Sequence, residues 1–326
     1  KWYPYGEVVG STFQVYYGDS SGEVFTPGDT VELDHWEGMF PGDFNGDGLA
    51  DLAHHNSFTD QLLTQLNEGG VLQASVETSL ESLFYERIVL DVDGDGNDDL
   101  THGGYHGEPA KLVVSNGEGA FTQTHTFDVP ACYVTAGAWA DYDGNGELDF
   151  AVVGDCNAIL GVPPIAIHLQ QDGVFSTVQE MPGVHAADPS EMVAGHFNDD
   201  GIVDLAVAGG QWPWDAAATI EIFHGNGDGT FKAPLTETFD MGSLAELRPT
   251  DANADGLQDL FVAVGTNVEL LVNDGSDSFT RCVLSTEGSE KLRHAGDFNH
   301  DGIEDIVTTY LDENEEEAIR IWLSQP

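Results

Sequence analysis

The sequence predicts an all-β fold built from a repeated unit of about fifty residues. Three observations support this prediction. Short segments rich in valine, isoleucine, leucine and phenylalanine alternate with turn residues along the whole chain. A nine-residue acidic segment that contains glycine recurs six times. Between these segments, an apolar strand followed by a glycine-containing turn and a bulky residue recurs seven times, the last time incompletely.

The acidic segments have the pattern of cation-binding loops. The first, at 43–51, carries oxygen-bearing side chains at positions one, three, five and nine and glycine at position six. Calcium takes about six to eight oxygen ligands, and this alternation, with the backbone carbonyl of position seven, lets one tight loop supply several. We name the segments loops one to six; they are 43–51, 91–99, 141–149, 196–204, 251–259 and 297–305.

The ligands expected in each loop follow from these positions. They are Asp43, Asn45, Asp47, Leu49 and Asp51; Asp91, Asp93, Asp95, Asn97 and Asp99; Asp141, Asp143, Asn145, Glu147 and Asp149; Asn198, Asp200 and Asp204; Asp251, Asn253, Asp255, Leu257 and Asp259; and Asp297, Asn299, Asp301, Ile303 and Asp305. His196 replaces the leading carboxylate of loop four, so we expect weak or absent metal binding there. About five Ca²⁺ sites are therefore expected, with loop four as a doubtful sixth.

These loops differ from EF-hands. An EF-hand needs a bidentate glutamate at its twelfth position and helices on both sides. None of the six loops has an acidic residue at the twelfth position, and short β-prone segments such as 260–264 follow them. The loops are therefore expected to join strands. The strongest helical alternative is a turn or two at 77–83.

Each repeat is interpreted as strand A, acidic loop, strand B, connection, strand C, glycine turn and strand D. In the second repeat these strands are predicted at 86–90, 100–102, 111–115 and 120–127. Four strands in about fifty residues predict a β-propeller of four-stranded antiparallel blades, with the calcium loops between strands A and B. Seven blades are expected, the first and last incomplete; six blades closed by the N-terminal hairpin are the alternative. Blades contact only their neighbours, so we expect one domain over 1–326.

The composition limits the partners of the chain. It has 326 residues, with 58 acidic against 9 basic side chains and a formal net charge of −49. Even six calcium ions would leave most of this charge on solvated surface. Such a surface repels nucleic acid and anionic membranes, so neither is an expected partner. The excess of aspartate would also suit a saline habitat.

The expected location is outside the cell or on its surface. No apolar run approaches the ~20 residues that span a bilayer, and no signal segment is visible at Lys1. Calcium loops of this kind would fill poorly at cytosolic calcium. Cys132 and Cys156 lie on either side of loop three, where a disulfide would suit an oxidising compartment; Cys282 is expected to be buried in a strand.

Two segments carry a resemblance to a known family. Gly-Asp-Phe-Asn-Gly-Asp-Gly-Leu-Ala-Asp-Leu, from Gly42 to Leu52, resembles the FG-GAP/VCBS repeat, and so does the segment from Gly296 to Ile306. Integrin α-subunit head propellers and many bacterial secreted proteins carry such repeats. The resemblance extends over essentially the whole chain. It implies a calcium-binding propeller whose ligands are those named above, with His196 as the departure, and it implies no particular activity.

A ligand would bind the face opposite the calcium loops. The candidate residues there come from connections between strands B and C and are Trp212, Trp214, Tyr105, His106 and His54. Aromatic rings pack on sugar rings, so a glycan or a surface protein is the expected partner, and the chain is expected to be monomeric or part of a larger surface protein. Alternatively, the two tryptophans plug the central channel or pack between blades.

Catalysis is the less favoured interpretation. The sequence contains no nucleophile elbow, Cys-x-x-Cys pair or phosphate-binding loop, and it identifies no catalytic residue. A polysaccharide lyase or glycoside hydrolase built on the propeller stays as the alternative. For a lyase acting on acidic glycans, Arg87, Arg248 and Arg293 precede metal loops and could line a central channel.

Overall fold

The computed structural model describes residues 11–18, 25–33, 39–56, 59, 61–80, 87–102, 109–128, 133–155, 165–181, 189–210, 217–239, 244–264, 267–275, 278–285, 291–296, 303–311 and 317–322. These residues form strands, turns and bends, and none of them belongs to a helix that could cross a bilayer. Contacts divide the chain into two compact units, Lys1–Phe127 and Asp128–Pro326.

Unit one contains a hairpin and two four-stranded antiparallel sheets. The hairpin is β1 (Ser11–Gly18) and β2 (Phe25–Leu33); the sheets are β3 (Met39–Gly42), β4 (Asp51–Asn56), β5 (Gln61–Gln65) and β6 (Val76–Ser79), then β7 (Arg87–Leu90), β8 (Asp99–His102), β9 (Ala110–Ser115) and β10 (Phe121–Phe127). The first strands of the two sheets, β3 and β7, contact each other. The four strands predicted for the second repeat are confirmed to within about one residue.

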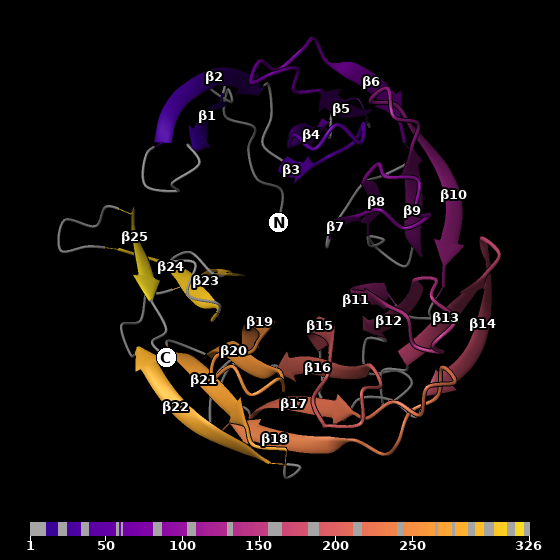
Figure 1. The fold of residues 1–326 in the computed structure, drawn as a ribbon, viewed down its shortest axis with the longest axis vertical. Helices are drawn as coiled ribbons and strands as arrows, with labels where there is room; N and C mark the ends of the chain where they lie inside the picture. Colours follow the sequence, from indigo (N-terminus) through magenta and orange to yellow (C-terminus); the bar gives the residue numbers. More distant parts are fainter. Residues whose placement is uncertain are drawn as a thin grey trace, which may run out of the picture. The chain divides into compact units, whose positions relative to one another are not determined.

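Unit two contains three four-stranded antiparallel sheets and one three-stranded sheet. They are β11 (Tyr133–Ala140), β12 (Asp149–Asp155), β13 (Ile165–Gln171) and β14 (Val174–Met181); β15 (Pro189–Gly195), β16 (Asp204–Gly210), β17 (Ala218–Phe223) and β18 (Leu235–Phe239); β19 (Leu244–Thr250), β20 (Asp259–Val264), β21 (Asn267–Asn273) and β22 (Phe279–Ser285); and β23 (Lys291–Gly296), β24 (Asp305–Leu311) and β25 (Glu317–Trp322). Figure 1 shows β11, β15, β19 and β23 on one side of this unit and β14, β18 and β22 on the other.

Strands of each sheet follow chain order, so every connection within a sheet is a hairpin. The prediction of an all-β fold with four-stranded antiparallel sheets is confirmed, and five complete sheets are consistent with propeller blades. The number of blades and their closure into a ring stay predictions, as does the single domain.

The core of each unit lies between consecutive sheets. In unit two, one buried cluster joins β11–β14 to β15–β18 and includes Ile165, Ile167, Leu205, Val207 and Phe223. A second joins β15–β18 to β19–β22. A strand between two such clusters is covered on both faces, and in strand β20 all six residues are buried. A strand covered on both faces carries a continuous apolar run, which explains its sequence Leu-Phe-Val-Ala-Val after Asp259.

Two expectations from the sequence are wrong. The segment at 77–83 is not a helical turn over its described part, because Val76–Ser79 is the edge strand β6, paired with β5 through Leu63↔Glu77. Cys282 lies in a strand as expected, but its side chain is exposed. Strand β22 is the last of its sheet, so its outer face meets solvent. Cys132 and Cys156, the predicted disulfide, lie outside the described residues.

Candidate metal centres

Five of the six predicted loops lie in the described part of the chain, and each joins the first strand of a sheet to the second. Loop six is described only from Ile303, and its ninth residue, Asp305, is buried at the start of β24. The other residues predicted for that loop, Asp297, Asn299 and Asp301, lie outside the described residues.

Backbone conformation explains the glycine at position six. Gly48, Gly96, Gly146, Gly201 and Gly256 have φ angles from 72° to 92°. This left-handed region favours glycine because a Cβ atom would crowd the following carbonyl. In loop five, position four is also left-handed although the residue is Ala254, with φ of 58°.

The residue at position two anchors each loop to the core. Phe44, Val92, Tyr142 and Phe197 are buried, and Tyr142 packs edge-on against Phe231 with ring centroids 5.6 Å apart. Sequence reasoning missed this role. Position two is apolar in all six loops, which is the signal that could have revealed it.

Side-chain oxygens of the loops accept hydrogen bonds from their own backbone. In loop two, the Gly96 N–H donates to Asp91 Oδ2 at 2.9 Å, and the Asp95 N–H donates to Asp93 Oδ1 at 3.1 Å. Equivalent bonds run from Gly48, Gly146 and Gly256 to the position-one carboxylates of loops one, three and five. Short polar side chains commonly close turns in this way. The bonds curl each loop so that its oxygens converge.

The ninth position has a distinct role in every described loop. Asp51, Asp99, Asp149, Asp204 and Asp259 are buried. Each accepts one N–H from position two of its own loop and a second N–H from a residue at the end of the third strand or just beyond it. For Asp99 these donors are Val92, at 3.0 Å, and Ser115, at 2.9 Å. The ninth aspartate therefore ties its loop to the end of the third strand of the same sheet.

Burial raises the pKa of four of these aspartates. It raises the pKa of Asp99 to about 7 and the pKa values of Asp149 and Asp259 to about 6, although backbone N–H donors oppose the shift. The pKa of Asp51 is also raised, mainly by burial. Neighbouring loop carboxylates add a smaller rise. A bound cation would reverse this tendency, because it favours the charged carboxylate.

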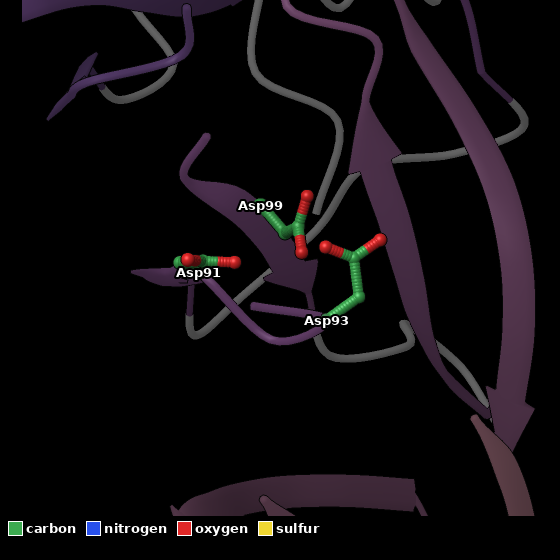
Figure 2. A group of neighbouring side chains, drawn as sticks. All are labelled: Asp91, Asp93 and Asp99. Atoms are coloured by element: carbon green, nitrogen blue, oxygen red, sulfur yellow. The ribbon is translucent and has the colours of Figure 1, made fainter. Parts of the chain in front are cut away.

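Two loops bring three carboxylates together. Asp91, Asp93 and Asp99 each place one oxygen within 4.8 Å of the others, and Asp141, Asp143 and Asp149 do the same. Figure 2 shows the Asp93 and Asp99 carboxylates facing each other, with Asp91 directed toward the same space. Each triad could hold a metal ion. In loops one and five, position three is asparagine, whose amide oxygen is also a ligand for hard cations.

The donors of these loops fit a hard divalent cation. They are all oxygens, and each carboxylate that accepts an N–H retains lone pairs for an ion. Among the described residues, no lysine or arginine pairs with a carboxylate of loops two and three. Like charges held this close repel one another, and a divalent cation would offset that repulsion.

Loop four lacks a carboxylate at position one, and protein nitrogens surround its oxygens. His196 Nδ1 lies 3.1 Å from the carbonyl oxygen of Ile202, the position-seven ligand of the pattern. His224 Nδ1 lies 3.0 Å from Asp204 Oδ2, and Lys232 Nζ lies 3.7 Å from Asp200 Oδ2. The expectation of weak or absent metal binding there stays a prediction, with a structural reason: groups of the protein contact the oxygens that an ion would need.

The residues predicted to bind a ligand are mostly outside the described part of the chain. Trp212, Trp214, Tyr105 and His106 all lie there. His54 is described and half-buried in β4, and burial lowers its pKa, with a smaller contribution from His55.

One further polar cluster lies on the first strands of unit two. Arg248 Nη1 of β19 lies 3.5 Å from Glu191 Oε2 of β15. Burial raises the pKa of Glu191 to about 7; Arg248 opposes this rise and Glu246 adds to it. Of the three arginines predicted to line a channel, Arg248 is therefore placed beside Glu191. The side chains of Arg87 and Arg293 lie outside the described residues.

Comparison with known proteins identifies the repeat. A family model described as FG-GAP-like repeat matches residues 91–152 and 251–308, which include the sequences of loops two, three, five and six. The chain carries FG-GAP-like repeats. The predicted resemblance is confirmed in these two regions, each of which begins at one metal loop and extends through the next loop along the chain. No curated protein sequence matches the chain.

Solved structures similar to the chain include these two. One is an Agrocybe aegerita lectin that recognises non-reducing terminal N-acetylglucosamine; its TM-score is 0.57 at 16% identity, over 88% of this chain and 80% of the lectin. The other is the Tc holotoxin pore of Photorhabdus luminescens, with a TM-score of 0.42 at 15% identity, over 96% of this chain and 17% of that one. The likeness to the lectin concerns the fold.

Proposed function

We propose that this chain is a calcium-stabilised β-propeller that binds a partner at the cell surface or outside the cell. The carboxylate triads of loops two and three carry the proposal. Loops one, two, three, five and six would hold Ca²⁺ through the side chains at positions one, three, five and nine and the carbonyl at position seven. Loop four would hold none. The ions would connect the first two strands of each blade and stabilise the folded state by mass action.

The proposed partner is a glycan, with a surface protein as the other outcome. The fold-level likeness to a lectin that recognises terminal N-acetylglucosamine supports this choice. The surface charge supports it too, because a chain with net charge −49 repels nucleic acid and anionic lipid but not neutral sugars. The tryptophans at 212 and 214 would stack on sugar rings on the face opposite the calcium loops.

Calcium dependence is tested first. We expect the thermal transition to rise when millimolar Ca²⁺ is added to chelator-treated protein, and calorimetry to detect bound calcium. The Asp91→Ala, Asp141→Ala double variant should bind less calcium than wild type. Identical transitions with and without Ca²⁺ would contradict the proposal.

Glycan binding is tested on an array, with and without chelator. We expect binding to sugars with terminal N-acetylglucosamine or related neutral residues. A Trp212→Ala, Trp214→Ala double variant should lose binding while its thermal transition is retained. The matched control is the Val71→Ala, Val174→Ala double variant, which truncates two exposed apolar side chains. Unchanged binding by the tryptophan variant would exclude the aromatic loop, and wild-type binding to proteins alone would favour a surface protein as the partner.

The Glu191–Arg248 cluster favours one second candidate, a polysaccharide lyase or glycoside hydrolase. A carboxyl group with a pKa of about 7 beside another carboxyl group suits general acid–base chemistry, and the arginine would pair with a uronate. Product absorbance or reducing sugar from a polysaccharide panel, lost in Glu191→Gln, would support catalysis. Absence of turnover on every substrate tested would exclude catalysis and leave binding as the one proposed function.

A further inference from the structure

The residue at position eight links one metal loop to the preceding loop. The Asp43 N–H, at position one of loop one, donates to Asp98 Oδ2 of loop two at 2.7 Å. The Asp98 N–H donates back to the Asp43 carbonyl oxygen, also at 2.7 Å. Loops one and two therefore hold each other through a reciprocal pair of hydrogen bonds, and one partner is a predicted calcium ligand.

The same reciprocal pair joins loops four and five. The His196 N–H donates to Gln258 Oε1 at 2.8 Å, and the Gln258 N–H donates to the His196 carbonyl at 3.0 Å. Gln258, like Asp98, occupies position eight. Among the described residues the arrangement is therefore found in both units, with a carboxylate oxygen as acceptor in one case and an amide oxygen in the other.

Packing brings loops one and two into close contact. A Cβ atom added to Gly46, at position four of loop one, would lie 2.9 Å from the carbonyl oxygen of Gly96 and 3.2 Å from Oδ1 of Asn97. Gly96 and Asn97 are positions six and seven of loop two, and Asn97 supplies the predicted carbonyl ligand. A change in the backbone of either loop therefore reaches the ligand positions of the other.

We propose that loops one and two bind calcium as a coupled pair, with Asp98 as the positioning residue that couples them. This inference rests on the proposed calcium function. An ion in loop two fixes the backbone at 91–99, and Asp98 then holds the Asp43 backbone in place. The Asp43 carboxylate needs less ordering when the second ion binds, so each ion raises the affinity for the other. The described pair of loops four and five does not couple two ions in this way, because loop four begins with His196.

Two glycine amides report each site separately. The Gly48 N–H donates to Asp43 Oδ2 at 2.7 Å, and the Gly96 N–H donates to Asp91 Oδ2 at 2.9 Å. An ion on the carboxylate polarises this bond, so the two amide resonances should shift as their own loops fill. A calcium titration of the deuterated, ¹⁵N-labelled full chain should move both resonances at midpoints that agree within about twofold.

Coupling is measured by weakening one loop and observing the other. In Asp93→Ala, the Gly96 response should be lost and the Gly48 midpoint should rise about five- to tenfold. The matched control is Asp143→Ala, the same position in loop three, which should leave the Gly48 midpoint unchanged. If Asp93→Ala does not fold, Asp91→Asn replaces it, because an amide oxygen still accepts backbone N–H groups of the loop while one carboxylate is removed from the site.

The role of Asp98 is tested by a double-mutant cycle. In an Asp98→Ala background, adding Asp93→Ala should change the Gly48 midpoint by less than about twofold. In Asp98→Asn the coupling should persist, because the amide oxygen of Gln258 accepts the same bond in the other pair. Asp98→Asn keeps the hydrogen-bond acceptor and removes the negative charge, so it shows which of the two the coupling requires.

Three results would overturn the inference. An unchanged Gly48 midpoint in Asp93→Ala, with the Gly96 response lost, would show independent sites and leave the calcium proposal standing. Coupling that survives in Asp98→Ala would show that Asp98 does not carry it. No shift of Gly48, Gly96 or Gly146 with calcium would overturn the calcium proposal and the coupling together.

Discussion

Loops three and four lie in neighbouring sheets of the same unit and differ at one decisive position. Loop three begins with Asp141, whose carboxylate forms a triad with Asp143 and Asp149. Loop four begins with His196, whose ring contacts the carbonyl oxygen of Ile202. Both keep the buried ninth aspartate and its two backbone donors. The ninth aspartate therefore serves the fold with or without an ion, whereas the first position decides whether the loop could hold one.

The largest expected effect concerns the ninth aspartate. Asp149→Ala and Asp204→Ala should each lower the free energy of unfolding by roughly 3 kcal/mol or more, because two buried N–H groups lose their acceptor at ~1–3 kcal/mol each. Urea unfolding in chelator measures this without any contribution from calcium. If Asp204→Ala costs less than about 1 kcal/mol, the aspartate of loop four is not a structural tie.

The second largest expected effect is the calcium-dependent stabilisation, which should depend on loop three and not on loop four. At a concentration about a hundred times Kd, each ion should stabilise the chain by about 2.7 kcal/mol. Asp141→Ala should lose one such contribution, measured as the difference between urea midpoints in Ca²⁺ and in chelator. His196→Ala should keep the wild-type difference. A smaller calcium response in His196→Ala would show that loop four binds an ion after all.

The pH dependence sharpens the same comparison. Asp149 and Asp259 titrate at about 6 and Asp99 at about 7 in the folded chain, against 3.8 when unperturbed. The folded state then binds more protons than the unfolded chain between pH of about 4 and about 7, so calcium-free protein should become more stable as the pH falls through this window.

Calcium competes with those protons, so its stabilising effect should shrink over the same range. Urea midpoints at a series of pH values, in chelator and in Ca²⁺, measure both trends. The control is Asp149→Asn, which removes one titrating group and should flatten the dependence in chelator. A calcium-free chain that loses stability from pH 7 to pH 5 would contradict the assignment.

The smallest effect concerns position four. Ala254 has a φ of 58°, where loops one to three have glycine. Ala254→Gly should stabilise the chain by about 0.5–1 kcal/mol, because relief of the left-handed strain exceeds the added freedom of the unfolded chain. Asp199→Gly in loop four is the control. Among the described residues other than glycine, only Asp172 and Ala254 have positive φ, so this control should bring no gain.

Much of the fold could be predicted because its information is local. The strands of the second repeat could be predicted from alternating apolar residues. The loops could be predicted from the spacing of oxygen-bearing side chains and glycine within each nine-residue segment. The pattern also predicted the ligand positions at one, three, five and nine. It could not reveal the role of position eight, where alanine, aspartate, leucine, valine, glutamine and glutamate all occur.

The sequence by itself determined the repeat, the strand order within each sheet and the residue types that can surround a cation, because these depend on neighbours along the chain. Only the tertiary structure decided that Asp98 faces Asp43, that Lys232 and His224 contact loop four, and that Cys282 is exposed. Each of these contacts depends on how strands and sheets pack, and packing brings together residues whose separation in sequence carries no local pattern.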